Sequence, residues 1–67
     1  MNLFSGSEKQ MRRLRKGDRV RWRLFSGTSL TGEVTERTRE GITVDWDSGI
    51  SGQFPFWNRL AWNMEKL

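Results

Sequence analysis

Three segments of the sequence alternate between apolar and polar residues, and this alternation limits the chain to few folds. In "DRVRWRLF", the apolar residues Val20, Trp22 and Leu24 occupy every second position. "LTGEVTERT" and "ITVDWD" repeat the pattern further along the chain. A period of two places successive side chains on opposite faces of a strand, so each segment is predicted to be a half-buried β-strand.

Turn signals separate these segments and indicate two further strands. "SGTS", "REG" and "SG" follow the three segments in turn, and such Gly-containing and Ser-containing stretches favour turns. "ISGQFPF" is predicted to be a short fourth strand, in which Pro55 has no N–H to donate and belongs at an edge or at the strand's end. Five short strands at this spacing favour an all-β fold, a five-stranded antiparallel barrel.

The last segment, "LAWNMEKL", allows two interpretations. As the fifth strand it would place Leu60, Trp62 and Met64 on one face, and we favour this alternation. Phe56, Leu60 and Met64 are also four residues apart, which is typical of a helix over residues 56–66. "WNR", just before, can form a single helical turn.

The N-terminal segment also leaves two interpretations open. Ser7 and Gln10 have the spacing of a capping box, and Gly17 can take the left-handed conformation that ends a helix. These signals predict a short basic helix over residues 8–16. A helix this short is marginal without a surface to pack on, so a disordered arm is the alternative.

The positive charge of the chain is concentrated in residues 1–16. Five of the 12 basic residues and one of the eight acidic residues lie there, so this segment carries the whole net charge of +4. Residues 17–67, over which the barrel is expected, contain seven of each and are neutral. A basic arm on a neutral body indicates nucleic-acid binding less strongly than a basic face on the fold would.

Charges on the neutral body are expected to pair with one another. If the first three strands are neighbours, opposite charges on their outer faces can meet across the sheet. Such exposed pairs contribute about 0–1 kcal/mol each. The arginines concerned are Arg19, Arg21 and Arg23, and the acidic residues are Glu33, Asp45 and Asp47.

The composition argues against catalysis. The 67 residues include no Cys and no His, which removes disulfides, thiolate ligands and the commonest general base. Asp45 and Asp47 could share a face, but neighbouring arginines are expected to lower both pKa values and prevent acid–base work. We therefore expect no enzymatic activity, no metal and no cofactor.

The sequence also predicts a cytoplasmic protein without a membrane partner. No apolar run approaches the roughly 20 residues of a membrane span. The first residues, "MNLFSGSEKQMRRLRK", contain no apolar stretch long enough for a secretory signal.

Four stretches together resemble the strands of SH3-like barrels of the Tudor and KOW sort. They are "KGDRVRWR", "GEVTE", "ITVDWDSG" and "FPFWNRLAW", and the resemblance covers residue 16 to about residue 66. It implies a binding domain, since KOW-type barrels bind RNA, DNA or proteins of the transcription and translation machinery. Type II dihydrofolate reductases share the "GDRVR" opening, but this chain has "SGQFPFW" where their pore has "VQIY".

Tudor domains hold a methylated cation in an aromatic cage, and the likeness to them implies which residues would correspond to that cage. The nearest equivalents would be Trp22, Phe25, Trp46 and Asp47. The alternation, however, places Trp22 and Trp46 on the inner face of the sheet.

Binding is the predicted function, with two classes of partner left open. A nucleic acid or a nucleic-acid-associated complex would contact the basic arm through phosphates and the exposed aromatics through bases, which contribute roughly 1–3 kcal/mol each. A protein partner, as for an adaptor, an antirepressor or a phage-type inhibitor, would bind the same Trp, Phe and Arg residues. The candidate binding residues are Arg12, Arg13, Arg15, Lys16, Arg21, Arg23, Phe25, Trp57 and Arg59.

The aromatic residues are expected to divide between core and surface. Val44, Trp46 and Phe54 are predicted to be core. Phe56 and Trp57 follow the break at Pro55, so one of them is expected to be exposed, and Trp57 is the better candidate.

The chain is expected to be a monomer or a small homo-oligomer. In an oligomer, Phe4, Met11 and Leu14 could cover a barrel edge.

Overall fold

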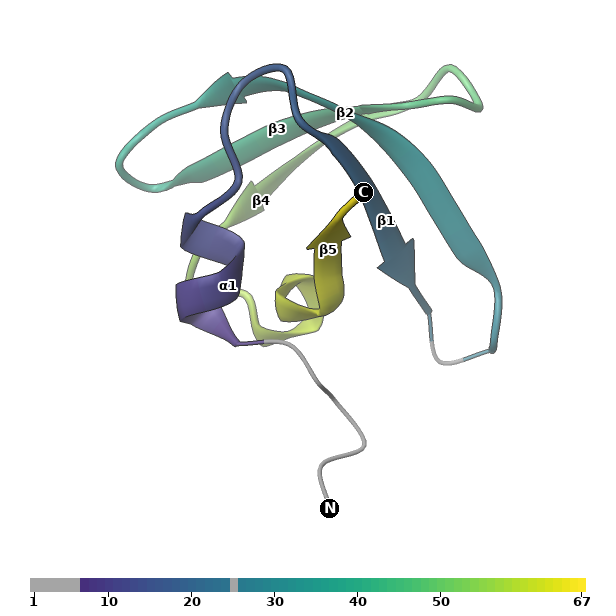
Figure 1. Ribbon diagram of the computed structural model, residues 1–67, viewed down its shortest axis with the longest axis horizontal. Coiled ribbons are helices and arrows are strands. Elements are labelled where there is room, and N and C mark those ends of the chain that lie inside the picture. Colours follow the sequence, from purple (N-terminus) through teal and green to yellow (C-terminus); the bar gives the residue numbers. More distant parts are fainter. Residues whose placement is uncertain (1–6, 25) are drawn as a thin grey trace.

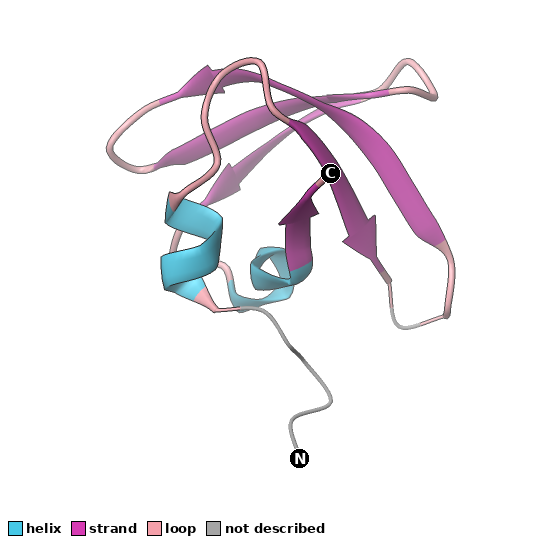
Figure 2. Cartoon of the chain, viewed as in Figure 1, coloured by secondary structure: helices cyan, strands magenta, loops and turns pink. Residues whose placement is uncertain are grey.

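The computed structural model describes residues 7–24 and 26–67 (Figure 1). A short helix opens this part of the chain and a 3₁₀-helix lies between the last two of five strands (Figure 2). In chain order the elements are α1 (Glu8–Arg12), β1 (Arg19–Arg23), β2 (Ser29–Arg37), β3 (Gly41–Trp46), β4 (Ser51–Pro55), η1 (Arg59–Asn63) and β5 (Met64–Lys66).

The five strands form one antiparallel sheet in the order β4-β3-β2-β1-β5. β2 is the longest strand, because residues 29–33 pair with β1 and residues 32–37 pair with β3. The register shifts between Val34 and Glu36, and such a bulge bends a strand and increases its twist. Figure 1 shows the resulting curvature. The prediction of an all-β, five-stranded antiparallel fold is confirmed, but β4 and β5 remain separate edges and the sheet is not closed.

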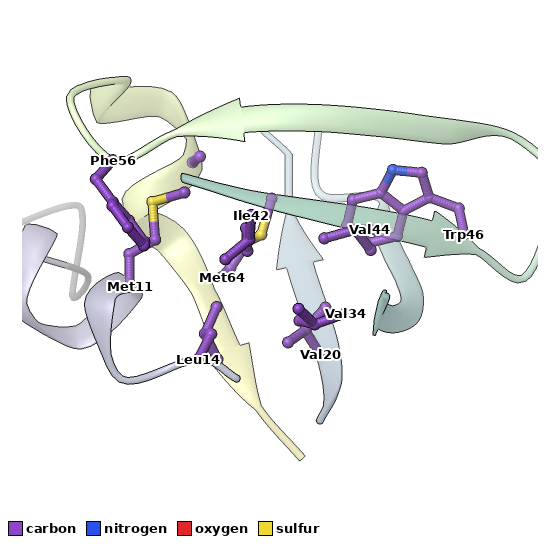
Figure 3. Packing of buried hydrophobic residues seen from close by; sticks show 10 residues of the cluster. Met11, Leu14, Val20, Val34, Ile42, Val44, Trp46, Phe56 and Met64 are labelled. Carbon is purple, nitrogen blue, oxygen red and sulfur yellow. The ribbon is translucent and has the colours of Figure 1, made fainter. Parts of the chain in front are cut away.

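One face of the curved sheet is covered by α1 and η1, which contact each other (Figures 1 and 2). The core lies between them and the sheet, as Figure 3 shows. Val44 and Trp46 are buried, as predicted, and Phe54 is half-buried against the same cluster. The buried residues are Met11, Leu14, Val20, Val34, Ile42, Val44, Trp46, Phe56, Ala61 and Met64.

The expected strand over residues 60–67 is confirmed only from Met64 onward, because η1 takes up the residues before it. The side-chain oxygen of Asn58 accepts a hydrogen bond from the N–H of Leu60 at 3.1 Å and caps this helix. Leu60 is consequently 57% exposed, while Met64 is buried, so these two residues do not share a face. The interpretation of 56–66 as one continuous helix is also wrong, because η1 ends at Asn63.

Residues 7–16 pack onto the fold instead of forming a disordered arm. Met11 and Leu14 are 0% and 2% exposed, so they belong to the chain's own core and cannot cover the edge of another copy. The capping signal is confirmed, since the Ser7 hydroxyl accepts a hydrogen bond from the N–H of Gln10 at 3.1 Å. The helix ends at Arg12, however, and not at residue 16. Phe4, the third residue proposed to cover an edge, lies outside the described residues.

The burial of Met11 predicts that the N-terminal segment contributes to folding. Met11→Ala should lower the free energy of unfolding by about 2–5 kcal/mol, the usual cost of such a core truncation. Lys9→Ala, on the same helix but exposed, should change it by less than about 0.5 kcal/mol. Urea denaturation followed by tryptophan fluorescence measures both. Equal stability of the two variants would show that α1 does not pack on the sheet.

Candidate functional site

The 12 basic residues fall into two groups in the structure. Five form ion pairs: Arg12 with Glu8, Arg19 with Asp47, Arg21 and Arg23 with Glu65, and Lys66 with Asp18. The other seven have no ion-pair partner within residues 7–24 and 26–67: Lys9, Arg13, Arg15, Lys16, Arg37, Arg39 and Arg59.

Residues 9–16, which we call the basic segment, are held against β2 by the turn that follows α1. The carboxylate of Asp18 accepts a hydrogen bond from the N–H of Arg15 at 2.9 Å. The N–H of Gly17 donates to the carbonyl of Val34 at 2.7 Å. Gly17 has a φ of 96°, in the left-handed region that glycine adopts without steric cost. The cations of the basic segment therefore project from a fixed backbone.

The basic segment meets the end of β2 at the ring of Phe56. The guanidinium carbons of Arg12 and Arg37 lie 4.7 and 5.4 Å from the centre of this ring. Nη2 of Arg37 also donates to the carbonyl oxygen of Arg12 at 2.7 Å. We call these three residues the Phe56 cluster. Cation–π attraction stabilises each guanidinium there, by about 0.5–1 kcal/mol at an exposed position.

Two guanidinium groups on one ring also favour an anion. Like charges that share a site repel each other, so an anion bound beside them relieves this repulsion. The carboxylate of Glu8 partly fulfils this role, since it lies 2.7 Å from Nε of Arg12. Arg37 has no carboxylate partner among the residues that the structure describes. The cluster thus offers a donor group to an incoming phosphate or carboxylate.

Trp57 directly follows the Phe56 cluster and is 74% exposed, the highest value among the exposed large hydrophobic residues of the described chain. Phe56 is 2% exposed, so the prediction that one of the two residues faces water is confirmed. The pair occupies the centre of a turn over residues 55–58, which we call the tryptophan turn. Its N-terminal residue comes from β4 and its C-terminal residue caps η1.

The backbone of the tryptophan turn is fixed on both sides by hydrogen bonds. The turn itself closes through a bond from the N–H of Asn58 to the carbonyl of Pro55 at 3.0 Å. The N–H of Phe56 donates to the carbonyl of Glu40 at 2.7 Å. The carbonyl of Phe56 accepts from Nε1 of Trp62, also at 2.7 Å. The turn therefore presents an exposed indole on a well-ordered backbone.

The structure brings together some of the predicted binding residues and separates others. Arg12, Arg13, Arg15 and Lys16 are exposed on the basic segment, and Arg12 contacts the ring of Phe56, which precedes Trp57 in the chain. Arg59 opens η1, two residues after Trp57, and its guanidinium carbon lies 5.8 Å from the Trp62 ring. Arg21 and Arg23 are both bound by Glu65 of β5 and do not join this surface. Phe25 lies outside the described residues.

Arg37 and Arg39 are cations that sequence reasoning did not select for the site. Arg37 ends β2 and reaches Arg12 across 25 positions of sequence. The only sequence signal was the "REG" turn, which begins at Arg39 and closely follows Arg37, and it says nothing about contact with the N-terminal segment.

The expected pairing of charges across the sheet is confirmed in part. Arg19 binds Asp47 through two N–H···O bonds of 2.9 and 2.6 Å, and the hydroxyl of Thr31 donates to the same carboxylate at 2.8 Å. These bonds lower the pKa of Asp47 from its ordinary value of 3.8 to about 2. Arg21 binds Glu65 rather than one of the three acidic residues expected, because β5 lies beside β1 and places Glu65 opposite Arg21.

Trp22 and Trp46, two of the four residues expected for an aromatic cage, pack together with Phe54 instead. The rings of Trp22 and Trp46 stack with centres 5.8 Å apart, and Phe54 packs edge-on against both at 5.1 and 5.8 Å. Rings this close contact each other directly and leave no space between them for a cation. The carboxylate of Asp47 is bound by Arg19 and Thr31.

A separate hollow of about 160 Å³ lies between the β2–β3 turn and β4. It is lined by Thr38, Glu40, Gly41, Ile42, Thr43, Gln53, Phe54 and Pro55. Glu40 supplies its single carboxylate, so paired carboxylates for acid–base work are not present there.

Other kinds of site are not found in the described chain. Within residues 7–24 and 26–67, no three His, Cys, Asp or Glu side chains are grouped as metal ligands. The interior of the same region contains no buried polar or charged side chain. No helix there combines the length and the apolar character needed to cross a membrane.

Comparison with known proteins leaves the function to be inferred from the site. No family model, no curated protein and no solved structure matches this chain.

The bonds to Asp47 predict a specific acid dependence of stability. Because the pKa of Asp47 is lower in the folded chain than its ordinary value, the carboxylate stabilises the fold above pH 4 and this contribution is lost as pH falls from about 4 to about 2. Asp47→Asn should therefore lose less stability than the wild type over that interval. The measurement is the urea midpoint as a function of pH.

Asp45→Asn is the matched control, since Asp45 is an exposed carboxylate on β3 that accepts a bond from the Ser51 hydroxyl at 3.1 Å. Because this variant keeps the Arg19–Asp47 pair, it should keep the acid-dependent loss of stability that the pair contributes. If Asp47→Asn and the wild type lose stability in parallel, the Arg19–Asp47 pair does not exist in solution.

Proposed function

We propose that the protein is a small non-enzymatic module that binds nucleic acid through the basic segment, the Phe56 cluster and Trp57. The observation that carries the proposal is the contact of Arg12 and Arg37 with the ring of Phe56, the residue that precedes the exposed Trp57 in the chain. This arrangement combines donors for phosphate oxygens with an aromatic surface for a base. Proteins that bind nucleic acids use this combination of groups.

The distribution of charge supports the proposal. The basic segment contains five cations and no acidic residue, and one of the five, Arg12, is paired with Glu8. Arg37 and Arg39 lie on the same hairpin as Glu36 and Glu40, so this hairpin adds little net charge. The attraction for a polyanion therefore comes mainly from residues 9–16, whose cations are exposed on a fixed backbone. A fixed array of cations loses less conformational entropy on binding than a disordered arm would.

The same proposal includes a finer description of the fold. We regard the five-stranded antiparallel sheet as an open form of the SH3-like barrel that the Tudor and KOW resemblance implies. Its support is the single antiparallel sheet over residues 19–66. In this sheet β1, β2, β3 and β4 are neighbours in chain order, and β5 pairs with β1.

A protein partner is the second candidate, and the exposed apolar residues favour it. Trp57 and Leu60 are 74% and 57% exposed and lie three residues apart. Exposed tryptophan near arginine is typical of the residues that dominate protein interfaces. Binding of this kind depends on apolar contact and changes little with salt, whereas phosphate contacts weaken steeply as salt increases.

Salt-dependent binding to short mixed-sequence DNA tests the first candidate. Replacing Arg13, Arg15 and Lys16 together by Gln removes three cations without removing the core residues Met11 and Leu14, which deletion of residues 1–16 would do. Loss of three phosphate contacts should reduce the slope of log affinity against log salt by about 2 for single strands and about 3 for duplex. Fluorescence anisotropy over a series of NaCl concentrations measures the slope.

A triple variant of equal charge provides the control. Arg21→Gln, Arg23→Gln and Lys66→Gln also remove three cations, but these side chains are paired with Glu65 or Asp18. This control should keep a slope close to that of the wild type. Equal loss in the two triple variants would mean attraction by net charge alone, and no binding by the wild type would reject the nucleic-acid proposal.

A further inference from the structure

We infer that Trp57 stacks on an unpaired base, so that the site selects single-stranded over double-stranded nucleic acid. This inference rests on the proposed function and specifies the class of nucleic acid that the site takes. Three features of the structure lead to it: the exposure of the indole, the hydrogen-bonded backbone of the turn that carries it, and the cations at the residue before Trp57 and shortly after it in the chain.

Trp57 is the one aromatic residue of the described chain whose side chain is exposed rather than buried or half-buried. The other tryptophans, Trp22, Trp46 and Trp62, pack against the core or belong to it. Two of them also satisfy their indole N–H within the chain, since Trp22 donates to the carbonyl of Leu60 and Trp62 to that of Phe56. Within the described fold, Trp57 neither packs against the core nor donates its indole N–H to another residue. A ligand with an aromatic face would bury this ring.

The tryptophan turn exposes this ring to solvent while hydrogen bonds hold the backbone that carries it. Hydrogen bonds hold the residue before Trp57 and the residue after it, through Phe56 to Glu40 and through Asn58 to Pro55. The entropy cost of ordering the backbone is therefore met by folding and not by binding. Stacking then requires only that the Trp57 side chain adopt one conformation against one base.

Cations contact the residue before Trp57 and follow shortly after it in the chain. Arg12 and Arg37 hold the ring of Phe56 on one side, and Arg59 follows two residues later. A nucleotide presents the complementary pair of groups, a flat base beside an anionic phosphate. A turn that carries an exposed indole between the Phe56 cluster and Arg59 in the chain therefore suits a nucleotide better than a purely apolar segment of a protein.

Base pairing decides between single and double strands at such a site. In a duplex each base is stacked between its neighbours and exposes only its edges in the grooves. An indole on a protruding turn cannot reach a base face there unless the base is first unstacked, which costs energy. In a single strand the face of a base is accessible without this cost.

Three probes of equal length separate stacking from charge: a 12-nucleotide single strand of mixed sequence, its duplex, and an abasic strand with the same phosphates. Trp57→Ala should weaken binding to the single strand by about 10-fold or more, as expected for one stacked base, with the salt slope unchanged. Its affinity for the duplex and for the abasic strand should not change. Trp57→Phe, which keeps an aromatic ring, should recover part of the loss.

Leu60→Ala is the matched control, because Leu60 is exposed and apolar on the neighbouring helix but offers no aromatic face. It should bind all three probes like the wild type. A second readout is the indole proton signal of Trp57, identified by its disappearance in Trp57→Phe. This signal should shift with the intact single strand and not with the abasic strand.

The outcomes distinguish this inference from the proposed function. If the Arg13, Arg15 and Lys16 variant loses affinity but Trp57→Ala binds the single strand like the wild type, nucleic-acid binding stands and base stacking is wrong. Equal losses on all three probes would likewise reject stacking. If the wild type binds none of the probes, both proposals fail, and a protein becomes the partner to seek for Trp57.

Discussion

The packing of α1 and Phe56 against one face of the sheet is the contact on which the rest of the structure depends. A sheet with two free edges leaves an apolar face that must be covered, and a 67-residue chain without cysteine has no disulfide to help. Met11, Leu14 and Phe56, together with η1, provide this cover. The same packing determines where the charges lie, because the cations of the basic segment occupy the positions between and beside the buried residues.

Local patterns in the sequence were sufficient for most of the elements. The alternation around Val20, Val44 and Trp46 gave the right strands and the right buried faces, and the Ser7–Gln10 spacing gave the helix start. The wrong or incomplete predictions concerned contacts between distant segments. Whether the sheet closes depends on the approach of β4 to β5, which no local pattern encodes. Leu60 fits a strand or a helix by periodicity, and the capping bond that its N–H donates to the Asn58 side chain favours the 3₁₀-helix.

The candidate site was predictable in its parts but not in its assembly. Trp57 stood out because the alternation breaks at Pro55, and residues 12–16 stood out by charge. The sequence could not separate Arg12 from Arg21, since both are arginines beside apolar residues. The fold separates them, because β5 places Glu65 opposite Arg21 while the end of β2 places a second arginine, Arg37, beside Arg12. Which distant residue an arginine meets is thus a property of the topology.

The two buried residues of the basic segment also determine which of its side chains face the solvent. Met11 in α1 and Leu14 just beyond its end are both buried, and the N–H of Leu14 donates to the carbonyl of Met11 at 3.1 Å, so one backbone turn links them. Inserting or deleting a single residue between them would therefore break this turn and displace the cations on one side of the change, even if every charge were kept. Exposed side chains within this stretch can therefore be replaced, but the number of residues in it cannot change. A binding surface made in this way can vary its charges readily, whereas its spacing is constrained by the interior of the protein.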